Sequence, residues 1–249
     1  MSGNPVTPGY PVRVRGDLDP ALSRWMWIVK WILAIPHYIV LFFLHIAYTV
    51  VTVIAFFAIL FTGRYPRRLF DFSVGVTRWT WRVSYYVWTV LGTDRYPPFT
   101  LDSRADYPAD LEVDYPERLH RGLVLVKWWL LAIPHYLIVG ALVGGAITLA
   151  TGEMDDSVVF AIPLLGVLVL VAVFALLFTG RYPQGLFDFL MGINRWMIRV
   201  QVYAGLLRDE YPPFRLDQGA REETAPIEEA SPAVDTSKPA GDTTETGDE

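Results

Sequence analysis

Two long apolar stretches dominate the pattern of hydrophobic and polar positions along the chain. Between Tyr38 and Phe61 the only strongly polar side chain is His45, and residues 157–179 carry no charge. A helix needs about 20 apolar residues to cross roughly 30 Å of hydrocarbon, so both stretches are long enough to span a bilayer. This pattern predicts an all-α integral membrane protein.

Five sequence blocks occur twice, in the same order. They are Ala-Ile-Pro-His-Tyr (residues 34–38 and 132–136), Phe-Thr-Gly-Arg-Tyr-Pro (61–66 and 178–183), Leu-Phe-Asp-Phe (69–72 and 186–189), Arg-Trp-x-x-Arg-Val (78–83 and 195–200) and Tyr-Pro-Pro-Phe (96–99 and 211–214). An internal repeat of this kind predicts two copies of one structural unit. We therefore divide the chain into an N-terminal polar segment (1–20), repeat 1 (21–102), repeat 2 (103–217) and a tail (218–249).

The spacing between the blocks bears on the number of spans. Repeat 2 has about 19 extra residues between His135 and Phe178, including a polar turn at residues 151–156, which predicts a hairpin of helices at 123–150 and 157–179. In repeat 1, residues 25–62 fit either two spans of about 17 residues with a turn near His45, or a short interfacial helix before Pro36 and one span at 38–61. Lys30 and Lys127 lie near the hairpin starts, where a lysine can reach the headgroups.

The distribution of arginines favours the hairpin in repeat 1. Basic segments follow both span regions and also precede the second one, whereas the intervening loop at 151–156 is acidic. The positive-inside rule places all basic segments in the cytoplasm only if each repeat has an even number of spans. We therefore expect a multi-pass protein of the inner (plasma) membrane, with the basic segments and the tail in the cytoplasm.

An amphipathic helix is predicted after each span region. In repeat 2, apolar residues recur at three- and four-residue steps from Leu186 to Leu207, and polar residues recur on the opposite face. Repeat 1 has the same pattern, which is typical of a helix lying in the membrane interface. Guanidinium groups on such a helix are suited to anionic headgroups. The residues that we expect to face lipid or a ligand are Arg64, Asp71, Arg78, Arg82, Arg181, Asp188, Arg195 and Arg199.

The aspartate and the first arginine of each amphipathic helix are seven residues apart, about 10.5 Å along the axis. Gly75 and Gly192 lie between them and leave a notch in the helix surface. Three interpretations stay open: a structural network in which each aspartate caps a helix or pairs across the repeats, a headgroup or ligand site in the notch, and a catalytic site. We favour the structural network.

Candidate chemistry is otherwise sparse. The chain has no Gly-x-Ser-x-Gly elbow, no phosphate-binding loop and no His-Glu-x-x-His motif, so we expect no catalytic residues and no cofactor. It has no cysteine, which excludes disulfides and thiolate metal sites. His37 and His135 hold equivalent positions and are weak candidates for a shared metal site. No span carries a carboxylate, which argues against proton- or sodium-coupled transport.

Charge separates the tail from the rest of the chain. The composition is 53% hydrophobic and only 19% charged, with a net charge of −5. Residues 218–249 hold nine acidic and two basic residues, so the remainder is mildly basic. The tail lacks apolar periodicity and is predicted to be disordered. Because the first two dozen residues are polar and contain prolines, we expect no cleavable signal peptide. Nothing in the charge pattern leads us to expect a nucleic-acid partner.

The repeated blocks resemble a bacterial membrane family known as domain of unknown function 4389. The resemblance rests on Phe-Thr-Gly-Arg-Tyr-Pro, Leu-Phe-Asp-Phe, Arg-Trp-x-x-Arg-Val and Tyr-Pro-Pro-Phe in both repeats, and it covers about residues 10–217. It implies an inner-membrane protein in which this unit is often duplicated, and it implies no activity. Arg95 stands where repeat 2 has Glu210, and this difference argues against a symmetric ligand site.

Three functions are compatible with these patterns. The leading hypothesis is a non-enzymatic membrane protein whose paired amphipathic helices bind lipids, anionic ones in particular, or organise a membrane partner or a second copy of the chain. The alternative is a small transporter or channel subunit with a polar path between the repeats, lined by Asp71, Arg78, Asp188 and Arg195. A lipid-modifying enzyme is the third, although no nucleophile–base pair is recognisable.

Overall fold

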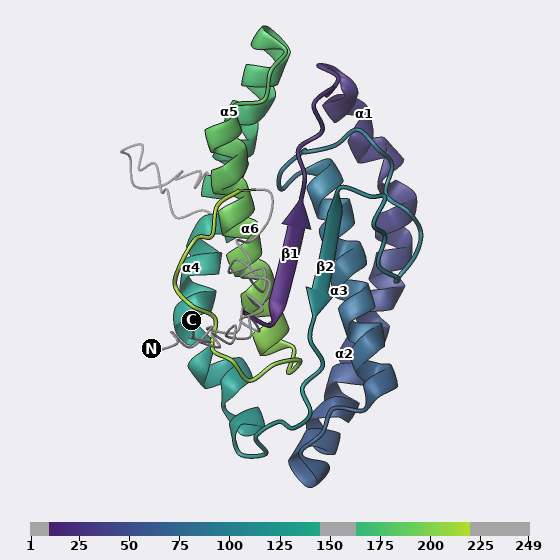
Figure 1. The fold of residues 1–249 in the computed structure, drawn as a ribbon, viewed down its shortest axis with the longest axis vertical. Helices are drawn as coiled ribbons and strands as arrows, with labels where there is room; N and C mark the ends of the chain where they lie inside the picture. Colours follow the sequence, from purple (N-terminus) through teal and green to yellow (C-terminus); the bar gives the residue numbers. More distant parts are fainter. Residues whose placement is uncertain (1–9, 145–162, 220–249) are drawn as a thin grey trace, which may run out of the picture. The chain divides into compact units, whose positions relative to one another are not determined.

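The structure is a computed structural model that describes residues 10–144 and 163–219 (Figure 1). The predicted polar turn at 151–156 lies outside these residues, as does the predicted disordered tail beyond residue 219. In chain order the elements are β1 (Val12–Gly16), α1 (Met26–Leu33), α2 (Ile35–Thr62), α3 (Arg67–Val87), β2 (Ala109–Val113), the 3₁₀ turn η1 (Leu123–Leu125), the π-helical segment η2 (Lys127–Leu131), α4 (Ile133–Gly144), α5 (Leu164–Thr179) and α6 (Gln184–Ala204).

Most of the described chain is helical, as predicted, but the two repeats also share a small sheet that an all-α class does not contain. Strand β1 pairs with β2 in antiparallel register, with Val14 opposite Leu111. The strands have a visible sequence signal, because apolar Val12 and Val14 alternate with charged residues over the five positions of β1. Each strand follows a Tyr-Pro pair, at residues 10–11 and 107–108, so the structural unit of repeat 1 starts before residue 21.

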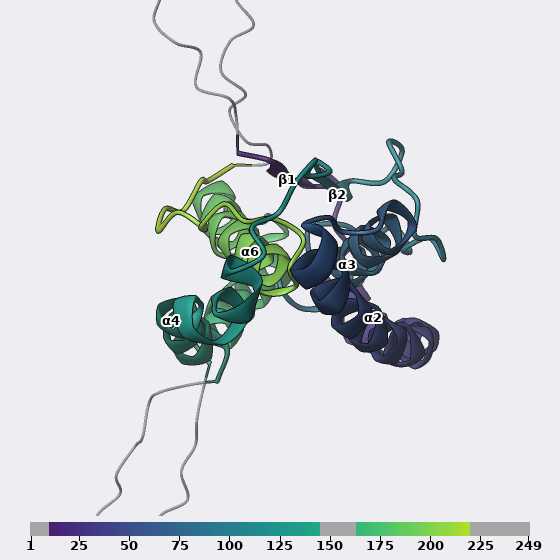
Figure 2. The same cartoon turned by 90° about the horizontal axis from the view of Figure 1, so that it is seen from below.

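The elements of residues 10–219 form three layers, seen end-on in Figure 2. The sheet is one outer layer, and α3 and α6 form the middle layer, with α3 against β2 and α6 against β1. Helices α1 and α2 pack on α3, and η2 and α5 pack on α6 in the same way. The repeats are therefore built alike, with the apolar helices on the side of the middle layer away from the sheet.

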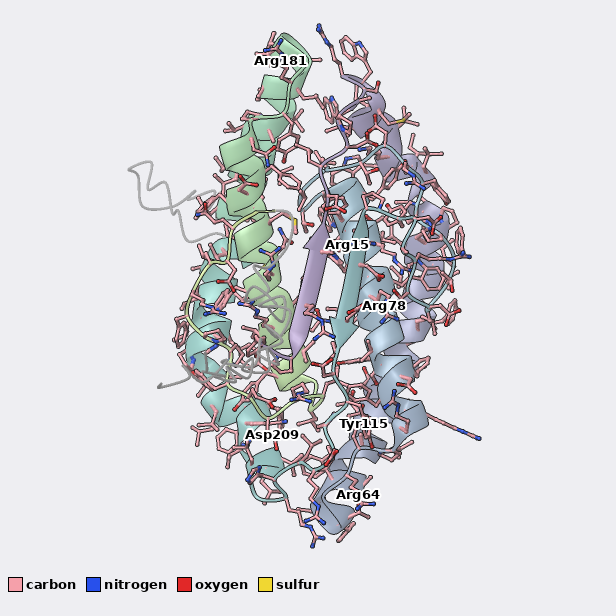
Figure 3. All side chains as sticks on the ribbon, viewed as in Figure 1. Arg15, Arg64, Arg78, Tyr115, Arg181 and Asp209 are labelled. Atoms are coloured by element: carbon pink, nitrogen blue, oxygen red, sulfur yellow. The ribbon has the colours of Figure 1, made fainter. Side chains whose placement is uncertain are left out.

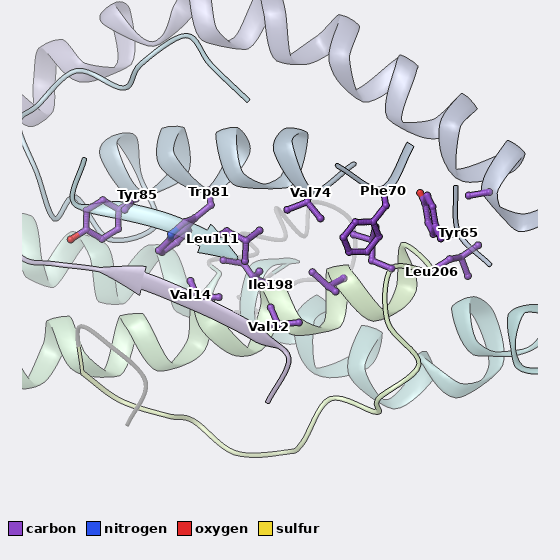
Figure 4. Close-up of a cluster of buried hydrophobic side chains, with 14 of the residues drawn as sticks. Val12, Val14, Tyr65, Phe70, Val74, Trp81, Tyr85, Leu111, Ile198 and Leu206 are labelled. Carbon is purple, nitrogen blue, oxygen red and sulfur yellow. The ribbon is translucent and has the colours of Figure 1, made fainter. Parts of the chain in front are cut away.

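The main core lies between the sheet and the middle layer (Figure 4). Val12 and Val14 of β1 and Leu111 of β2 are fully or nearly fully buried against α3 and α6 side chains. The strand backbone approaches these helices closely at Gly16, where an added Cβ would lie 2.6 Å from Met191 and 2.9 Å from Tyr85. Side chains of both middle helices thus contact the strand at Gly16, and a larger residue there would have to displace Met191 and Tyr85.

The turn predicted near His45 is wrong, because α2 runs unbroken for 28 residues. Residues 37–62 contain no glycine or proline, and the His45 ring lies 2.7 Å from the carbonyl of Leu41, a hydrogen bond within the helix. The helix ends at Gly63, which has a φ of 70°. The structure thus matches the alternative of a short helix before Pro36 followed by one long helix. Among the described residues, α2 is the one helix long and apolar enough to cross a membrane.

Helices α4 and α5 together correspond to α2. Counting from the shared motifs matches Ile133–Gly144 of α4 to residues 35–46 and Leu164–Thr179 of α5 to residues 47–62. Residues 145–163 are then a single insertion next to the position equivalent to His45. Repeat 2 therefore carries extra sequence at a place where repeat 1 has one continuous helix, α2.

A second, smaller insertion explains the π-helical segment. Lys30 precedes Ala34 by four residues, whereas Lys127 precedes Ala132 by five. The extra residue falls within η2, and a π turn absorbs one residue without changing the direction of the helix. Lys30 and Lys127 are consequently buried in the same way in the two repeats.

Deleting residues 145–163 should fuse α4 and α5 into one helix and leave the fold intact, because the junction restores the length of α2. We expect the melting temperature of the purified chain in detergent to stay within a few degrees of the parent. The matched control deletes Leu164 as well. One residue rotates α5 by about 100°, which turns Leu165, Val169 and Val173 away from α6 and should lower the melting temperature markedly. Equal behaviour of the two deletions would contradict the equivalence of α4–α5 with α2.

Candidate functional site

The arginines of the predicted amphipathic helices do not face lipid, because α3 and α6 present them to the sheet. Arg78 donates from Nε to the carbonyl of Leu111 in β2 at 2.7 Å, and Arg195 donates from Nε to the carbonyl of Val14 in β1 at 3.3 Å. Leu111 and Val14 are opposite each other in the sheet. Equivalent arginines therefore bind equivalent points of the two strands, and their first role is to join the layers.

The second arginine of each helix is also buried and paired. Arg82 forms an ion pair with Asp110 at 3.0 Å, and Asp110 also accepts from Arg78 at 3.2 Å. Burial lowers the pKa of the Arg82 guanidinium, and the charge of Asp110 opposes this shift. In repeat 2, Arg199 pairs with Asp217 at 2.6 Å. The partner of Arg82, Asp110, lies in β2, whereas the partner of Arg199, Asp217, lies in the segment after Tyr-Pro-Pro-Phe. Helical periodicity in the sequence reveals neither of these partners.

The glycine notches are filled by the chain itself, which contradicts the alternative interpretation of a ligand site in them. An added Cβ on Gly75 would lie 2.8 Å from the Cβ of Leu101, and one on Gly192 would lie 3.2 Å from the Cβ of Leu216. Both leucines belong to the segments that follow Tyr-Pro-Pro-Phe. The close approach allows Arg78 to donate from Nη1 to the carbonyl of Leu101 at 2.8 Å.

The two aspartates lie apart from these arginines. Asp71 is exposed and pairs with Arg67 at 3.1 Å, one turn earlier on α3. Asp188 accepts from Nε2 of Gln184 at 2.8 Å, also one turn earlier. Neither aspartate caps its helix, since α3 and α6 begin after prolines without a side-chain cap. The structure does not bring Asp71, Arg78, Asp188 and Arg195 together, so they form no shared polar path.

Buried lysines form a constellation that the sequence reading missed. Lys30 pairs with Asp94 at 2.8 Å, and Lys127 pairs with Asp209 at 2.7 Å. Both ammonium groups are buried, so neither lysine reaches headgroups as predicted. The signal was present in the sequence, because each repeat carries a lysine before Ala-Ile-Pro-His-Tyr and an aspartate before Tyr-Pro-Pro-Phe.

Arg64 belongs to a cluster of three arginines that we call the arginine site. Arg64, Arg118 and Arg121 line a cavity of about 420 Å³ at the end of α2. The backbone N–H of Leu119 donates to the carbonyl of Gly63 at 2.9 Å and holds the repeat 2 segment against this helix end. All three arginines are exposed, and within residues 10–144 and 163–219 none of them has an ion-pair partner. An anion is the ligand that this cavity suits best.

The corresponding end of α5 has a smaller basic group. Arg24 lies against Gly180, next to Arg181, but Ala21 stands where repeat 2 has Arg118. Figure 3 places Arg64 and Arg181 at opposite ends of the described chain. The predicted set of eight residues thus divides into four arginines that join the layers, two aspartates that lie apart from them, and two end arginines of which Arg64 belongs to a cavity.

The outer helices expose many large apolar side chains, and we call this set of residues the apolar face. In α2 only 11% of the most apolar 18-residue stretch is buried, although its mean hydropathy there is 2.4. The other outer helices contribute large exposed side chains in the same way. Members of the apolar face include Trp31, Ile39, Phe43, Ile46, Val53, Phe57, Trp128, Leu137, Val171 and Phe174.

A family model described as Domain of unknown function (DUF4389) matches residues 24–100 and 158–215, which is more than half of the chain. The chain belongs to the DUF4389 family. The two matches confirm the resemblance drawn from the sequence and the presence of two copies. The second match starts at residue 158, inside the insertion that interrupts the DUF4389 unit of repeat 2. No curated protein and no solved structure matches the chain.

The remaining DUF4389 motifs meet in one aromatic cluster per copy. His37 stacks on Phe99 at 4.0 Å and accepts a hydrogen bond at Nδ1 from Trp79 Nε1 at 3.1 Å. His135 donates from Nε2 to the carbonyl of Pro212 at 3.1 Å and lies 4.4 Å from the Phe214 ring. Each histidine is enclosed by the Tyr-Pro-Pro-Phe segment of its own copy, so the two do not form a shared metal site. No group of three potential metal-ligating side chains occurs in the part of the chain that the structure describes.

Replacing Asp110 with asparagine should destabilise the DUF4389 fold strongly, because it leaves Arg78 and Arg82 buried without their shared counter-charge. Breaking a buried pair in this way costs about 3–5 kcal/mol of unfolding free energy. Asp71→Asn on the same helix removes an exposed pair and should cost less than about 1 kcal/mol. Denaturant titrations of the purified chain in detergent measure both. Comparable losses in the two variants would show that Asp110 does not hold the layers together.

Proposed function

We propose that this DUF4389 protein is embedded in one leaflet of a membrane through its apolar face and binds anionic lipid headgroups at its arginine-bearing ends. The observation that carries this proposal is the combination of a nearly unburied apolar layer on one side of the middle helices and a charged sheet on the other. The function is lipid binding at a membrane surface, without an enzymatic step.

The exposure of α2 argues for a bilayer as its surroundings. An apolar helix of a water-soluble core would be mostly buried, whereas α2 is mostly exposed. Soluble monomers rarely expose a contiguous apolar patch of more than a few hundred Å². Trp31 and Trp128 are exposed near the start of the apolar layer in their repeats, and tryptophan favours the headgroup level.

The charged sheet argues against a spanning orientation. If α2 crossed the bilayer along its axis, the strands beside α3 would share its depth. The side chains of Arg13 and Glu112 are 44% and 59% exposed, and such groups cost about 2.5–3.5 kcal/mol each at the bilayer centre. With α2 parallel to the surface, the apolar face enters hydrocarbon and the sheet stays in water.

This orientation also satisfies the positive-inside rule, on which the prediction of a helical hairpin in each repeat was based. All basic segments then lie on one side of the membrane because the chain never crosses it. The arginine site sits at the end of α2, at the border of the apolar face, where the phosphate of an anionic lipid supplies the missing counter-charge. A phosphate can accept several charge-assisted hydrogen bonds from clustered guanidinium groups.

Replacing Arg64, Arg118 and Arg121 together with glutamine should weaken the retention of phosphatidylglycerol by the full chain at least about tenfold, since each basic residue near a membrane surface contributes about 1 kcal/mol. Native mass spectrometry of protein released from nanodiscs counts the retained lipids. The matched control replaces Arg13, Arg15 and Arg104, which lie at the sheet, and should leave retention unchanged. Equal retention by both triple variants would remove the arginine site from the proposal.

Single cysteines placed at Arg68 and at Arg181 should react with a membrane-impermeant maleimide from the same side of proteoliposomes. The chain has no native cysteine, so the background is clean. Because α2 and the α4–α5 pair end at opposite ends of the described chain, spanning helices would place the two labels in different compartments. Labelling from opposite sides would therefore exclude insertion into one leaflet.

A further inference from the structure

A cavity of about 610 Å³ lies between the two repeats. Its lining includes Thr77, Thr80 and Ser84 of α3, together with Asn194, Met197 and Gln201 of α6. The three α6 residues occupy the positions in repeat 2 that the three α3 residues occupy in repeat 1. The cavity therefore lies where the two middle helices meet, on the axis that relates the repeats.

The walls of the cavity come from the outer layer. Tyr48, Thr49 and Thr52 of α2 line one side, and Tyr136 and Val139 of α4 line the other. Thr49 and Tyr136 are exposed, so the cavity communicates with the surface between α2 and α4. Both helices carry the apolar face, which is the bilayer side in the proposed function. A ligand reaching the cavity from this side comes out of the membrane.

The lining mixes apolar side chains with polar ones. Among the described residues it contains no Asp, Glu, Lys, Arg or His, but it holds several hydroxyl groups and two side-chain amides. Thr52 and Thr77 donate their hydroxyl protons to carbonyls one turn earlier, at 2.8 and 3.0 Å. Thr49 and Thr80 do the same, so these four oxygens keep lone pairs that can accept a hydrogen bond.

Two further hydroxyls of the lining are buried and unsatisfied. The oxygen of Thr89 makes no hydrogen bond with any described residue, and the Tyr48 hydroxyl lies beside the hydroxyls of Thr52 and Thr77 without a hydrogen bond of good geometry. A buried polar group without a partner costs about 1–3 kcal/mol, so a ligand oxygen at this place is strongly favoured. The cavity thus offers free donors beside a row of acceptors, which matches a ligand that carries both hydroxyl and carbonyl oxygens.

We propose that this cavity binds the glycerol head of an uncharged lipid of the diacylglycerol class. The free hydroxyl of such a lipid donates to the threonine oxygens, and an ester carbonyl accepts from Tyr48. A volume of about 610 Å³ holds the head and the first part of the chains but not two complete acyl chains, which extend between α2 and α4 into the bilayer. This inference rests on the proposed function, because the chains must leave through the bilayer side.

The same chemistry excludes an anionic lipid from the cavity. A phosphate would be buried without any cationic side chain among the described lining residues, which is strongly unfavourable. Anionic lipids belong to the arginine site, at the end of α2. The two sites therefore select different headgroups. Variants of each site, tested with both lipids, distinguish binding at one site from binding at the other.

The test is a titration of the full-length protein in detergent with 1,2-dioleoylglycerol, followed by native mass spectrometry. Tyr48→Phe removes one unsatisfied hydroxyl with little change in volume, and we expect about three- to tenfold weaker binding. Thr77→Val, which removes an acceptor, should act in the same direction. Tyr38→Phe is the matched control, because Tyr38 is an exposed residue of α2 outside the cavity, and it should bind like the parent.

A parallel titration with phosphatidylglycerol distinguishes the two proposals. The triple arginine variant should lose phosphatidylglycerol and keep dioleoylglycerol, whereas Tyr48→Phe should show the reverse. Dioleoylglycerol binding that Tyr48→Phe and Thr77→Val leave unchanged, or that phosphatidylglycerol displaces from the cavity, would overturn the inference while the arginine site stands. Loss of selective phosphatidylglycerol binding alone would count against the proposed function and leave the cavity intact.

Discussion

The rest of the structure depends on the pairing of β1 with β2 and on the two arginines that bind its carbonyls. Among the described residues neither strand has a partner in its own repeat, and an isolated two-stranded sheet is at best marginally stable in water. Arg78 and Arg195 reach opposite points of this sheet from α3 and α6, and Asp110 and Asp217 neutralise the buried cations around them. One DUF4389 unit would leave its strand edge and its arginines unsatisfied, so duplication within one chain completes the fold. The same arrangement commits the charged sheet to one side and the apolar helices to the other.

Departures from symmetry coincide with the proposed sites. Arg118 completes the arginine site at the end of α2, and its counterpart in repeat 1 is Ala21. The cavity receives Tyr48, Thr49 and Thr52 from α2, whereas the matching positions of α5 are Leu165, Gly166 and Val169. The insertion of residues 145–163 also falls in the outer layer. The shared motifs, by contrast, hold the layers together in both repeats. Packing thus explains most of the repeated residues, and the proposed lipid sites add residues that differ between the copies, such as Arg118 and Tyr48, to repeated ones such as Arg64.

The sequence predicted the duplication, the helices and the family, because motif identity and apolar periodicity are local signals. Helical periodicity also predicted correctly that the arginines lie on one polar face of each helix. These arginines are Arg78 and Arg82 in α3 and Arg195 and Arg199 in α6. It did not predict what that face meets: Arg195 binds Val14, 181 residues away, and helical periodicity carries no information about such a partner. The alternation in β1 was readable but short. The turn near His45 failed because one polar side chain does not break a helix when its ring bonds to the preceding turn. The lysine–aspartate pairs were recoverable only by comparing the copies position by position.

Insertion into one leaflet has a direct geometric signature along α2. Spin labels at Ile39, Ile46 and Val53 occupy one exposed face at seven-residue steps, and their depth in the bilayer can be measured from the balance of oxygen and nickel-complex accessibility. Our account predicts a common depth for all three labels, because α2 lies parallel to the surface. A spanning α2 would change the depth by about 10 Å from each label to the next, and that result would contradict the account.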